Sequence, residues 1–362
     1  STPDEHGFCS FGANLWNKRA CALKARTVLA EVDATQIWTY GRNYIHVSQV
    51  DYFVEHTPHQ ITEAEFEQSI IAFEPAQQAL LRQIFAELTP HTRTEHIPYL
   101  LRGDQETVSF YASLLGIAEP DDVFKAIAHN VEPLIKDGDT IQIGVAGPTA
   151  YLPRLGVFDN RVDLGCHSEL GARGLGKLIE AGVVNGKRKT LHPGRAVFTS
   201  LEGFGSADLA IASGNPLIEL YDADYVVNIR TIAAHDNMVA LNSALSIDLT
   251  GQITCETTLG GRIWNGTGGQ PEFHMGAMLS KGGRALTLMP STALGGSVSR
   301  IVPQFDEGTV VTIPRYFADY VVTEYGVARL LGHSVRERAD QLIGVAHPDF
   351  RAELRQAAKR LF

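Results

Sequence analysis

The chain has 362 residues, of which 44% are hydrophobic and 20% are charged, a balance typical of a globular enzyme. Its formal net charge of −10 argues against nucleic acid as a partner, because phosphate backbones bind to basic surfaces. No apolar run approaches the roughly 20 residues that a membrane-spanning helix needs, so no membrane is expected as a partner either.

The first half of the chain changes character near residue 62. Residues 17–31 look like a helix that runs into a strand, and residues 43–54 alternate as a strand does before a turn. Between residues 62 and 130, apolar residues recur at helical spacing, and Glu-Pro or Thr-Pro pairs interrupt the pattern. This segment is therefore predicted to be a helical insertion.

From residue 131 onward, strand-like and helix-like stretches alternate, which is typical of an α/β domain with a largely parallel, buried sheet. The predicted fold class is α/β, divided into residues 1–61, 62–130 and 131–362. Strands are expected at 137–147, 196–200, 223–229, 252–256, 284–290, 308–313 and 319–324, and helices at 175–184, 205–214, 271–282, 335–346 and 349–361.

A polar cluster follows a short apolar strand in VDLGCHSELGARG, residues 162–174. Open α/β sheets bind ligands at the carboxyl ends of their strands, which is where Glu169 is expected. A carboxylate can attack an activated acyl group and form a covalent intermediate. It can equally cap or pair at the start of a helix, and spacing alone does not separate a catalytic Glu169 from a structural one.

A glycine-rich loop, GGRIWNGTGGQPEF at residues 260–273, precedes a helix expected to begin near Pro271. Glycine lets backbone N–H groups approach a ligand, and a helix N-terminus favours negative charge. The loop is thus suited to an oxyanion or a phosphate, although a plain glycine-rich turn would look the same. It matches neither a dinucleotide-binding GxGxxG nor a P-loop, and no histidine pair has the spacing of a metal site.

Several motifs in a fixed order resemble the acetyl-CoA hydrolase/transferase family, and within it the 4-hydroxybutyrate/acetate-type CoA-transferases of class I. The resemblance covers most of the chain outside the helical insertion. The matching stretches are residues 1–12, 45–51 (IHVSQVD), 137–144 (DGDTIQIG), 163–169 (DLGCHSE), 240–252 (ALNSALSIDLTGQ), 260–273, 279–292 (LSKGGRALTLMPST), 321–330 (VVTEYGVARL) and 346–354 (AHPDFRAEL).

The resemblance implies two CoA-transferase-like α/β domains and an acyl-CoA:carboxylate CoA-transferase that works by ping-pong through a glutamyl-CoA thioester. By motif match, Glu169 is the nucleophile, Asn228 is an active-site amide and Gly269 offers a backbone N–H to the oxyanion. Coenzyme A or acyl-CoA is implied as the substrate, with a carboxylic acid as its partner and no metal. The implied coenzyme-binding residues are Gly266, Gly268, Gly269, Gln270 and Lys281.

Three features depart from the family pattern. Family members carry a further stretch before the PDEHG motif, so the first α/β domain is expected to be incomplete and a second chain or a cleaved piece to supply the rest. Residues 170–174 (LGARG) stand where the family has Met-x-Ser-Asp-Gly, and the helical insertion is longer than the usual linker. The alternatives are an acyl-CoA hydrolase and a subunit of a two-chain enzyme, with recruited acyl-transfer chemistry or a non-catalytic role. An oligomer in the cytoplasm is expected, with the mitochondrion as the second compartment.

Overall fold

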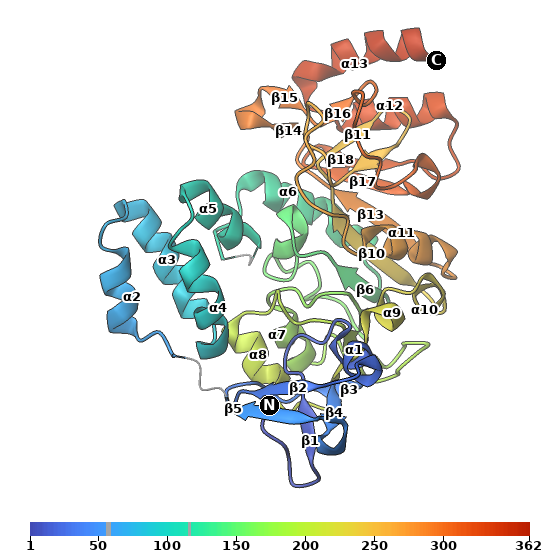
Figure 1. Cartoon of the computed structure of the whole chain (residues 1–362). Coiled ribbons are helices and arrows are strands. Elements are labelled where there is room, and N and C mark those ends of the chain that lie inside the picture. The colour runs from blue at the N-terminus through green and yellow to red at the C-terminus, as the bar shows by residue number, and fades with distance from the viewer. Residues whose placement is uncertain (56–58, 115–116) are drawn as a thin grey trace.

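The computed structural model describes residues 1–55, 59–114 and 117–362. Within them, the centre of the molecule is a nine-stranded sheet in which every neighbouring pair is parallel except β17 and β18 (Figure 1). The predicted α/β fold is confirmed. In spatial order the strands are β18 (Gly326–Arg329), β17 (Tyr320–Thr323), β13 (Arg284–Leu288), β10 (Met238–Ser243), β6 (Thr140–Ile143), β7 (Gly165–His167), β8 (Ala196–Phe198), β9 (Ile218–Leu220) and β3 (Tyr40–Gly41).

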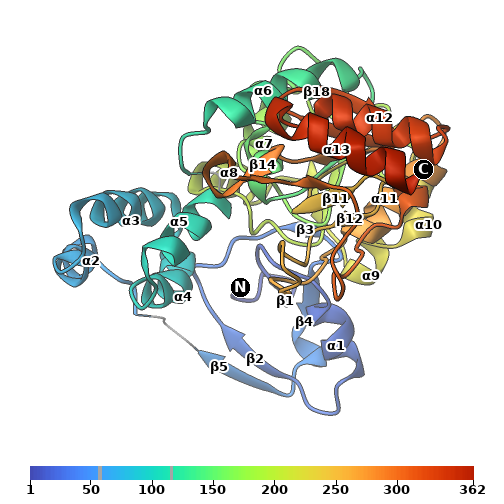
Figure 2. The same ribbon diagram turned by 90° about the horizontal axis from the view of Figure 1, so that it is seen from above.

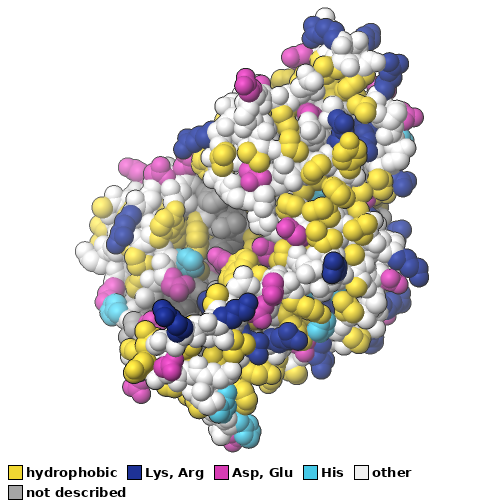
Figure 3. Space-filling view, turned by 45° about the vertical axis from the view of Figure 1, so that its right-hand side comes forward, with side chains coloured by type: hydrophobic (Ala, Val, Ile, Leu, Met, Phe, Trp, Pro, Cys, Tyr) yellow, Lys and Arg dark blue, Asp and Glu magenta, His cyan; other side chains and the backbone are white. Residues whose placement is uncertain are grey.

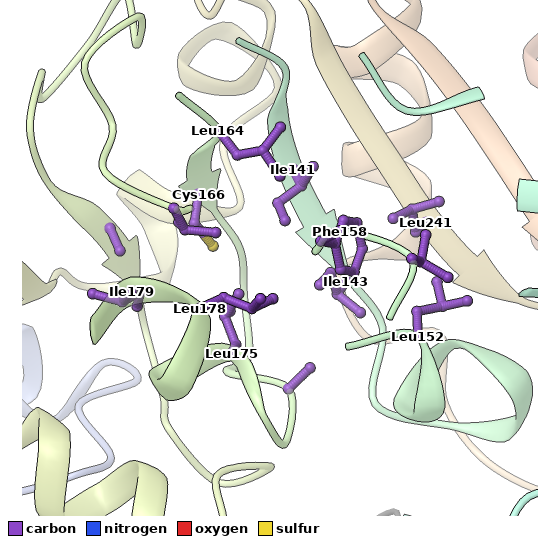
Figure 4. Packing of buried hydrophobic residues seen from close by; sticks show 14 of the residues in the cluster. Ile141, Ile143, Leu152, Phe158, Leu164, Cys166, Leu175, Leu178, Ile179 and Leu241 are labelled. Atoms are coloured by element: carbon purple, nitrogen blue, oxygen red, sulfur yellow. The ribbon is translucent and has the colours of Figure 1, made fainter. Parts of the chain in front are cut away.

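The central strands of this sheet are buried on both faces. On one face, Ile141 and Ile143 of β6 share a core with Cys166 of β7 and with α7 (Leu175–Glu180), as Figure 4 shows. On the other face, α11 (Gln270–Leu279) packs Phe273 against the strands. Because helices cover both faces, the carboxyl ends of the strands form a fixed platform.

The described part of residues 62–130 is mostly helical, as the spacing of its apolar residues indicated, and has its own hydrophobic core, in which Phe66 and Phe85 stack with ring centroids 4.1 Å apart. Figures 1 and 2 both show it as a lobe beside the sheet. Residues 115 and 116, at the end of one expected helix, lie outside the described residues. The lobe comprises α2 (Glu63–Ile70), α3 (Pro75–Glu87), α4 (Pro90–Leu100) and α5 (Gln105–Leu114), and α6 (Asp122–Val131) then returns to pack against β17.

The N-terminal segment, residues 1–55, forms small pairings and contributes β3 to the edge of the large sheet. A cavity of about 680 Å³ lies between this segment and Thr94 and Glu95 of α4, and Figure 3 shows the surface hollowed beside the helical lobe. The division of the chain at residue 61 stays a prediction. The elements of this segment are β1 (Phe8–Ser10), α1 (Lys18–Lys24), β2 (Leu29–Val32), β4 (Tyr44–His46) and β5 (Tyr52–Glu55).

The C-terminal part adds a second hydrophobic core beyond the large sheet. Both expected closing helices are present there. No helix in the described part of the chain has the length and apolar character needed to cross a bilayer. The elements are β11 (Ser246–Asp248), β12 (Ile253–Thr254), β14 (Thr292–Ala293), β15 (Val298–Ser299), β16 (Ile301–Val302), α12 (Val335–Val345) and α13 (Pro348–Leu361).

Two predicted strands are wrong. Residues 223–229 form α9 (Ala223–Val226) and the start of α10 (Ile229–Ala233), because the Asn228 side chain accepts the Arg230 N–H at 2.9 Å and caps α10. Residues 308–313 form no strand in the described structure, apart from an isolated bridge at Ile313. Strand β10 was not predicted, since a strand buried on both faces shows no alternation of apolar and polar residues.

Candidate active site

Glu169 lies two residues beyond the end of β7, at the carboxyl edge of the sheet. Its backbone carbonyl accepts the N–H groups of Thr199 and Ser200, each at 3.1 Å. The Ser168 hydroxyl donates to the carbonyl of Leu170 at 2.7 Å. The backbone is therefore held on both sides of Glu169, which fixes the direction of its side chain.

The Glu169 carboxylate contacts the glycine pair that precedes α11. Its Oε2 accepts the N–H of Gly269 at 2.8 Å. A Cβ at Gly269 would lie 2.7 Å from that oxygen, so a glycine is required for this approach. Gly268 has a φ of +56°, a conformation that other residues rarely adopt. The glycine-rich loop thus packs directly against the Glu169 carboxylate.

The environment of Glu169 disfavours its charged form. Burial raises the pKa of the Glu169 carboxyl above its ordinary value, the Gly269 N–H opposes that rise, and the Glu272 carboxylate adds to it. Among the described residues, Gly269 is the one hydrogen-bond donor to this side chain. The carboxylate is therefore poorly solvated and keeps oxygen lone pairs that are not engaged.

A cavity of about 350 Å³ opens beside Glu169, a volume at the lower end of the range for small-molecule sites. In its wall, Gln142 of β6 and Asn242 of β10 exchange two side-chain hydrogen bonds of 3.0 and 2.9 Å. Glu169 and Arg300 are its charged lining residues in the described structure. Most of the remaining lining comes from residues 143–149, 243–245 and 264–267.

The structure brings some of the predicted site residues together with Glu169. Gly266, Gly269 and Gln270 line the same cavity, and Gly268 lies beside the carboxylate. The Gln270 side chain is buried, and its Nε2 has no hydrogen-bond partner among the described residues. A buried donor in a cavity wall is suited to bind a polar group of a ligand.

Asn228 and Lys281 do not line this cavity. Asn228 is exposed, and besides capping α10 it donates from Nδ2 to the Asp224 carbonyl at 3.3 Å. Lys281 follows the far end of α11, and a helix of ten residues is about 15 Å long. Its ammonium is exposed and lies 3.8 Å from Asp236, at the amino edge of the sheet.

Sequence reasoning missed Gln142 and Asn242. Each occupies a buried position near the end of a strand that is otherwise largely apolar. A polar residue within an apolar strand was a usable indication, because buried amides need hydrogen-bond partners. No local pattern indicates that the partner of one is the other, 100 residues away.

Comparison with known proteins gives concordant matches. Residues 205–358 match the model of the acetyl-CoA hydrolase/transferase C-terminal domain. A 4-hydroxybutyrate coenzyme A transferase of Clostridium kluyveri is 40% identical over 363 residues, which cover 100% of this chain and 71% of that protein. A succinyl-CoA:cyclohexane-1-carboxylate CoA transferase of Geobacter metallireducens is 33% identical and is covered over 70% of its length, with 100% of this chain aligned.

A solved structure agrees with these matches. The crystal structure of a 4-hydroxybutyrate CoA-transferase from Porphyromonas gingivalis is similar with a TM-score of 0.73 and 34% identity. The superposition covers 100% of this chain and 73% of that one. The similarity thus extends over the sheet, the helical lobe and the N-terminal segment together.

Proposed function

Because the chain belongs to the acetyl-CoA hydrolase/transferase family, we propose that it is an acyl-CoA:carboxylate CoA-transferase with Glu169 as its nucleophile. Membership of this family confirms the resemblance found in the sequence and shows that the chain is an enzyme. The observation that supports the role of Glu169 is its position in the wall of the 350 Å³ cavity, with its carboxylate 2.8 Å from the Gly269 N–H.

In the first half of the proposed reaction, a Glu169 oxygen attacks the thioester carbon of acyl-CoA. The carbon–sulfur bond breaks, which gives an acyl-glutamyl anhydride and the thiolate of coenzyme A. The thiolate then attacks the glutamyl carbonyl carbon and releases the donor acid as a carboxylate, leaving a glutamyl-CoA thioester. An acceptor carboxylate runs the same two steps in reverse, so that a new acyl-CoA leaves and Glu169 is regenerated.

The neighbouring groups have distinct proposed roles. The Gly269 N–H, which bonds to Glu169 in the free enzyme, stabilises the oxyanion of the tetrahedral intermediate, a contribution of about 2.7–4 kcal/mol for one such donor. Gln270 donates its free Nε2 to a polar group of the substrate. Gly266 and Gly268 let the loop backbone approach coenzyme A.

Asn228 acts indirectly in this proposal. It orders the turn between α9 and α10, and in that turn Val227 packs close to Gly269, since a Cβ on Gly269 would lie 2.9 Å from its Cγ1. Lys281 has no contact with the substrate in this proposal, because it stands at the opposite edge of the sheet.

The test is to trap the glutamyl-CoA thioester. The protein is incubated with acetyl-CoA without an acceptor acid and treated with borohydride, which reduces a thioester to an alcohol, and the peptide carrying Glu169 is examined by mass spectrometry. We expect the reduced residue at Glu169 and no turnover by Glu169→Ala. An unmodified peptide from active protein, or an active Glu169→Ala variant, would refute the proposal. Release of coenzyme A that does not depend on the acceptor acid would identify a hydrolase instead.

A further inference from the structure

The loop that follows Glu169 is tied to the helical lobe by an ion pair. Arg173 Nη2 lies 2.5 Å from Oε2 of Glu87, the last residue of α3. The two side chains are only 16% and 33% exposed. A pair this well shielded is screened less by salt than a surface pair, and its geometry is better fixed.

Arg173 also lies close to an acid of the sheet domain. Asp208, on α8 (Ser206–Ala212), accepts the N–H of Gly174 at 2.9 Å and that of Gly205 at 3.2 Å. Burial raises the pKa of the Asp208 carboxyl, and the positive charge of Arg173 opposes this rise. The guanidinium therefore pairs with a carboxylate of the lobe and lies beside Gly205, whose N–H Asp208 accepts, since a Cβ on Gly205 would be 3.0 Å from Arg173 Nη1.

The loop between Glu169 and Arg173 is short, and neighbouring residues hold its backbone in place. Gly171 donates its N–H to the Ser200 carbonyl at 2.9 Å, and Leu170 bridges to the same residue. A Cβ on Gly171 would lie 2.5 Å from the Phe204 ring, so this stretch has no room to shift sideways. Three residues separate Glu169 from Arg173, so the ion pair anchors the far end of a short segment that begins at Glu169.

The lobe meets the site at a second place. Helix α5 packs against the 3₁₀ helix Gly147–Tyr151, the start of which lines the cavity. The lobe thus contacts the loop after Glu169 and, separately, a segment that forms part of the cavity wall.

We propose that the Glu87–Arg173 pair is a latch through which the helical lobe positions Glu169 for attack. Both are positioning residues, and the inference rests on the proposed function of Glu169. A small error in the placement of a reacting group costs rate far more than binding. Breaking the latch should therefore lower kcat and leave KM for acyl-CoA nearly unchanged.

The experiment reverses each charge in turn. In the intact protein, Glu87→Arg and Arg173→Glu are each expected to lower kcat by about ten-fold or more, and Arg173→Lys, which keeps a positive charge toward Glu87 and Asp208, to stay within about three-fold of the wild type. The matched control is Glu67→Arg, which breaks a 2.8 Å pair with Arg82 in the same lobe, where both side chains are exposed. The control should keep the wild-type kcat.

Two further measurements separate a latch from a merely structural contact. Because burial is the largest cause of the raised pKa of Glu169 in the free enzyme, loosening the loop should move the acidic limb of the kcat/KM–pH profile toward lower pH. The uncharged variant Glu87→Gln keeps the size of the side chain and serves if a charge reversal prevents folding. It should also lower kcat.

The outcomes are distinguishable. If Glu169→Ala keeps its turnover, the proposed function fails, and the latch fails with it. If Glu169→Ala is inactive but Glu87→Gln and the reversals keep the wild-type kcat and pH profile, the latch alone is overturned. It is also overturned if Glu67→Arg loses as much activity as Glu87→Arg, since the loss would then come from destabilising the lobe.

Discussion

Each edge of the large sheet holds a carboxylate, half-buried at Glu169 and buried at Asp139, and the two are surrounded differently. At the carboxyl edge, Glu169 accepts one N–H and faces a cavity. At the amino edge, Asp139 precedes β6 and pairs with Arg284 at the start of β13. Asp139 accepts from Arg284 through both oxygens, one bond being 3.2 Å, and from the Lys136 N–H at 2.6 Å. Its side chain is only 2% exposed.

This difference teaches that burial does not by itself mark a reactive group. Donors on both oxygens of Asp139 stabilise the anion and occupy the lone pairs that an attack would use. Burial disfavours the charged form of Glu169, a single hydrogen-bond donor offsets this, and a cavity adjoins the carboxylate. Within one sheet, the number of donors and the adjoining cavity separate the structural carboxylate from the candidate nucleophile.

The largest effect is expected at the carboxyl edge, from Gly269→Ala. The φ of Gly269 is −85°, which alanine adopts freely, so the added methyl acts through its close contacts, 2.7 Å to Glu169 Oε2 and 2.9 Å to Val227 Cγ1. Turnover should fall by about a hundred-fold or more, as when one oxyanion donor is lost. The control is Gly344→Ala in α12, away from the cavity, where a Cβ would meet no atom within 4 Å. Equal kinetics for the two variants would contradict the role of Gly269.

A substitution at the amino edge should lower the stability of the fold and leave catalysis unchanged. Asp139→Ala leaves the Arg284 guanidinium buried without its partner, which should lower the free energy of unfolding by about 3–5 kcal/mol. The kcat per folded molecule should stay near the wild-type value. Urea unfolding checks the first expectation, with Asp122→Ala as the control, because the Asp122–Lys125 pair is exposed. A catalytic defect in Asp139→Ala that matches that of Gly269→Ala would abolish the contrast between the edges.

The carboxyl edge was largely predictable from the sequence, and its internal pairings were not. The alternation after residue 131 indicated the parallel sheet, and the rule that ligands bind at the carboxyl ends of strands placed Glu169. The strand predicted at residues 223–229 was wrong because two adjacent valines suggested a strand, whereas Asn228 caps a helix there. Local patterns carry no information on which distant segments meet.

Two contacts illustrate that limit. The Gln142–Asn242 pair depends on β6 and β10 being neighbours, and β10 shows no periodicity by which to recognise it. The Glu87–Arg173 pair joins the helical lobe to the loop after Glu169, and nothing local to either residue indicates the other. Sheet order and lobe placement are set by packing of whole elements, so both contacts become visible only in three dimensions.

A smaller effect is expected from Glu169→Gln, and its sign depends on pH. Burial raises the pKa of Glu169, so the folded state binds its proton more tightly than the unfolded state, and ionisation costs stability as pH rises. Glutamine has no charge to desolvate and still accepts the Gly269 N–H. Calorimetry should give the variant a higher Tm at pH 7–8 and a difference that vanishes below about pH 4, the ordinary range of Glu. A variant that melts lower than the wild type at pH 8 would mean that the carboxylate is stabilised in place.

The smallest effect is expected from Lys281→Ala, which tests whether coenzyme A is bound at the carboxyl edge alone. Lys281 is 87% exposed at the amino edge, beyond the far end of α11 from Gly269. Its KM for acyl-CoA should stay within about two-fold of the wild type, as for most exposed surface substitutions. Gln270→Ala, at the first residue of α11 beside the carboxyl edge of the sheet, should raise that KM by about ten-fold, because a polar group of the substrate loses its buried donor. A rise in Lys281→Ala equal to that in Gln270→Ala would mean that the ligand reaches both edges, and the contrast between a reactive and a structural edge would not hold.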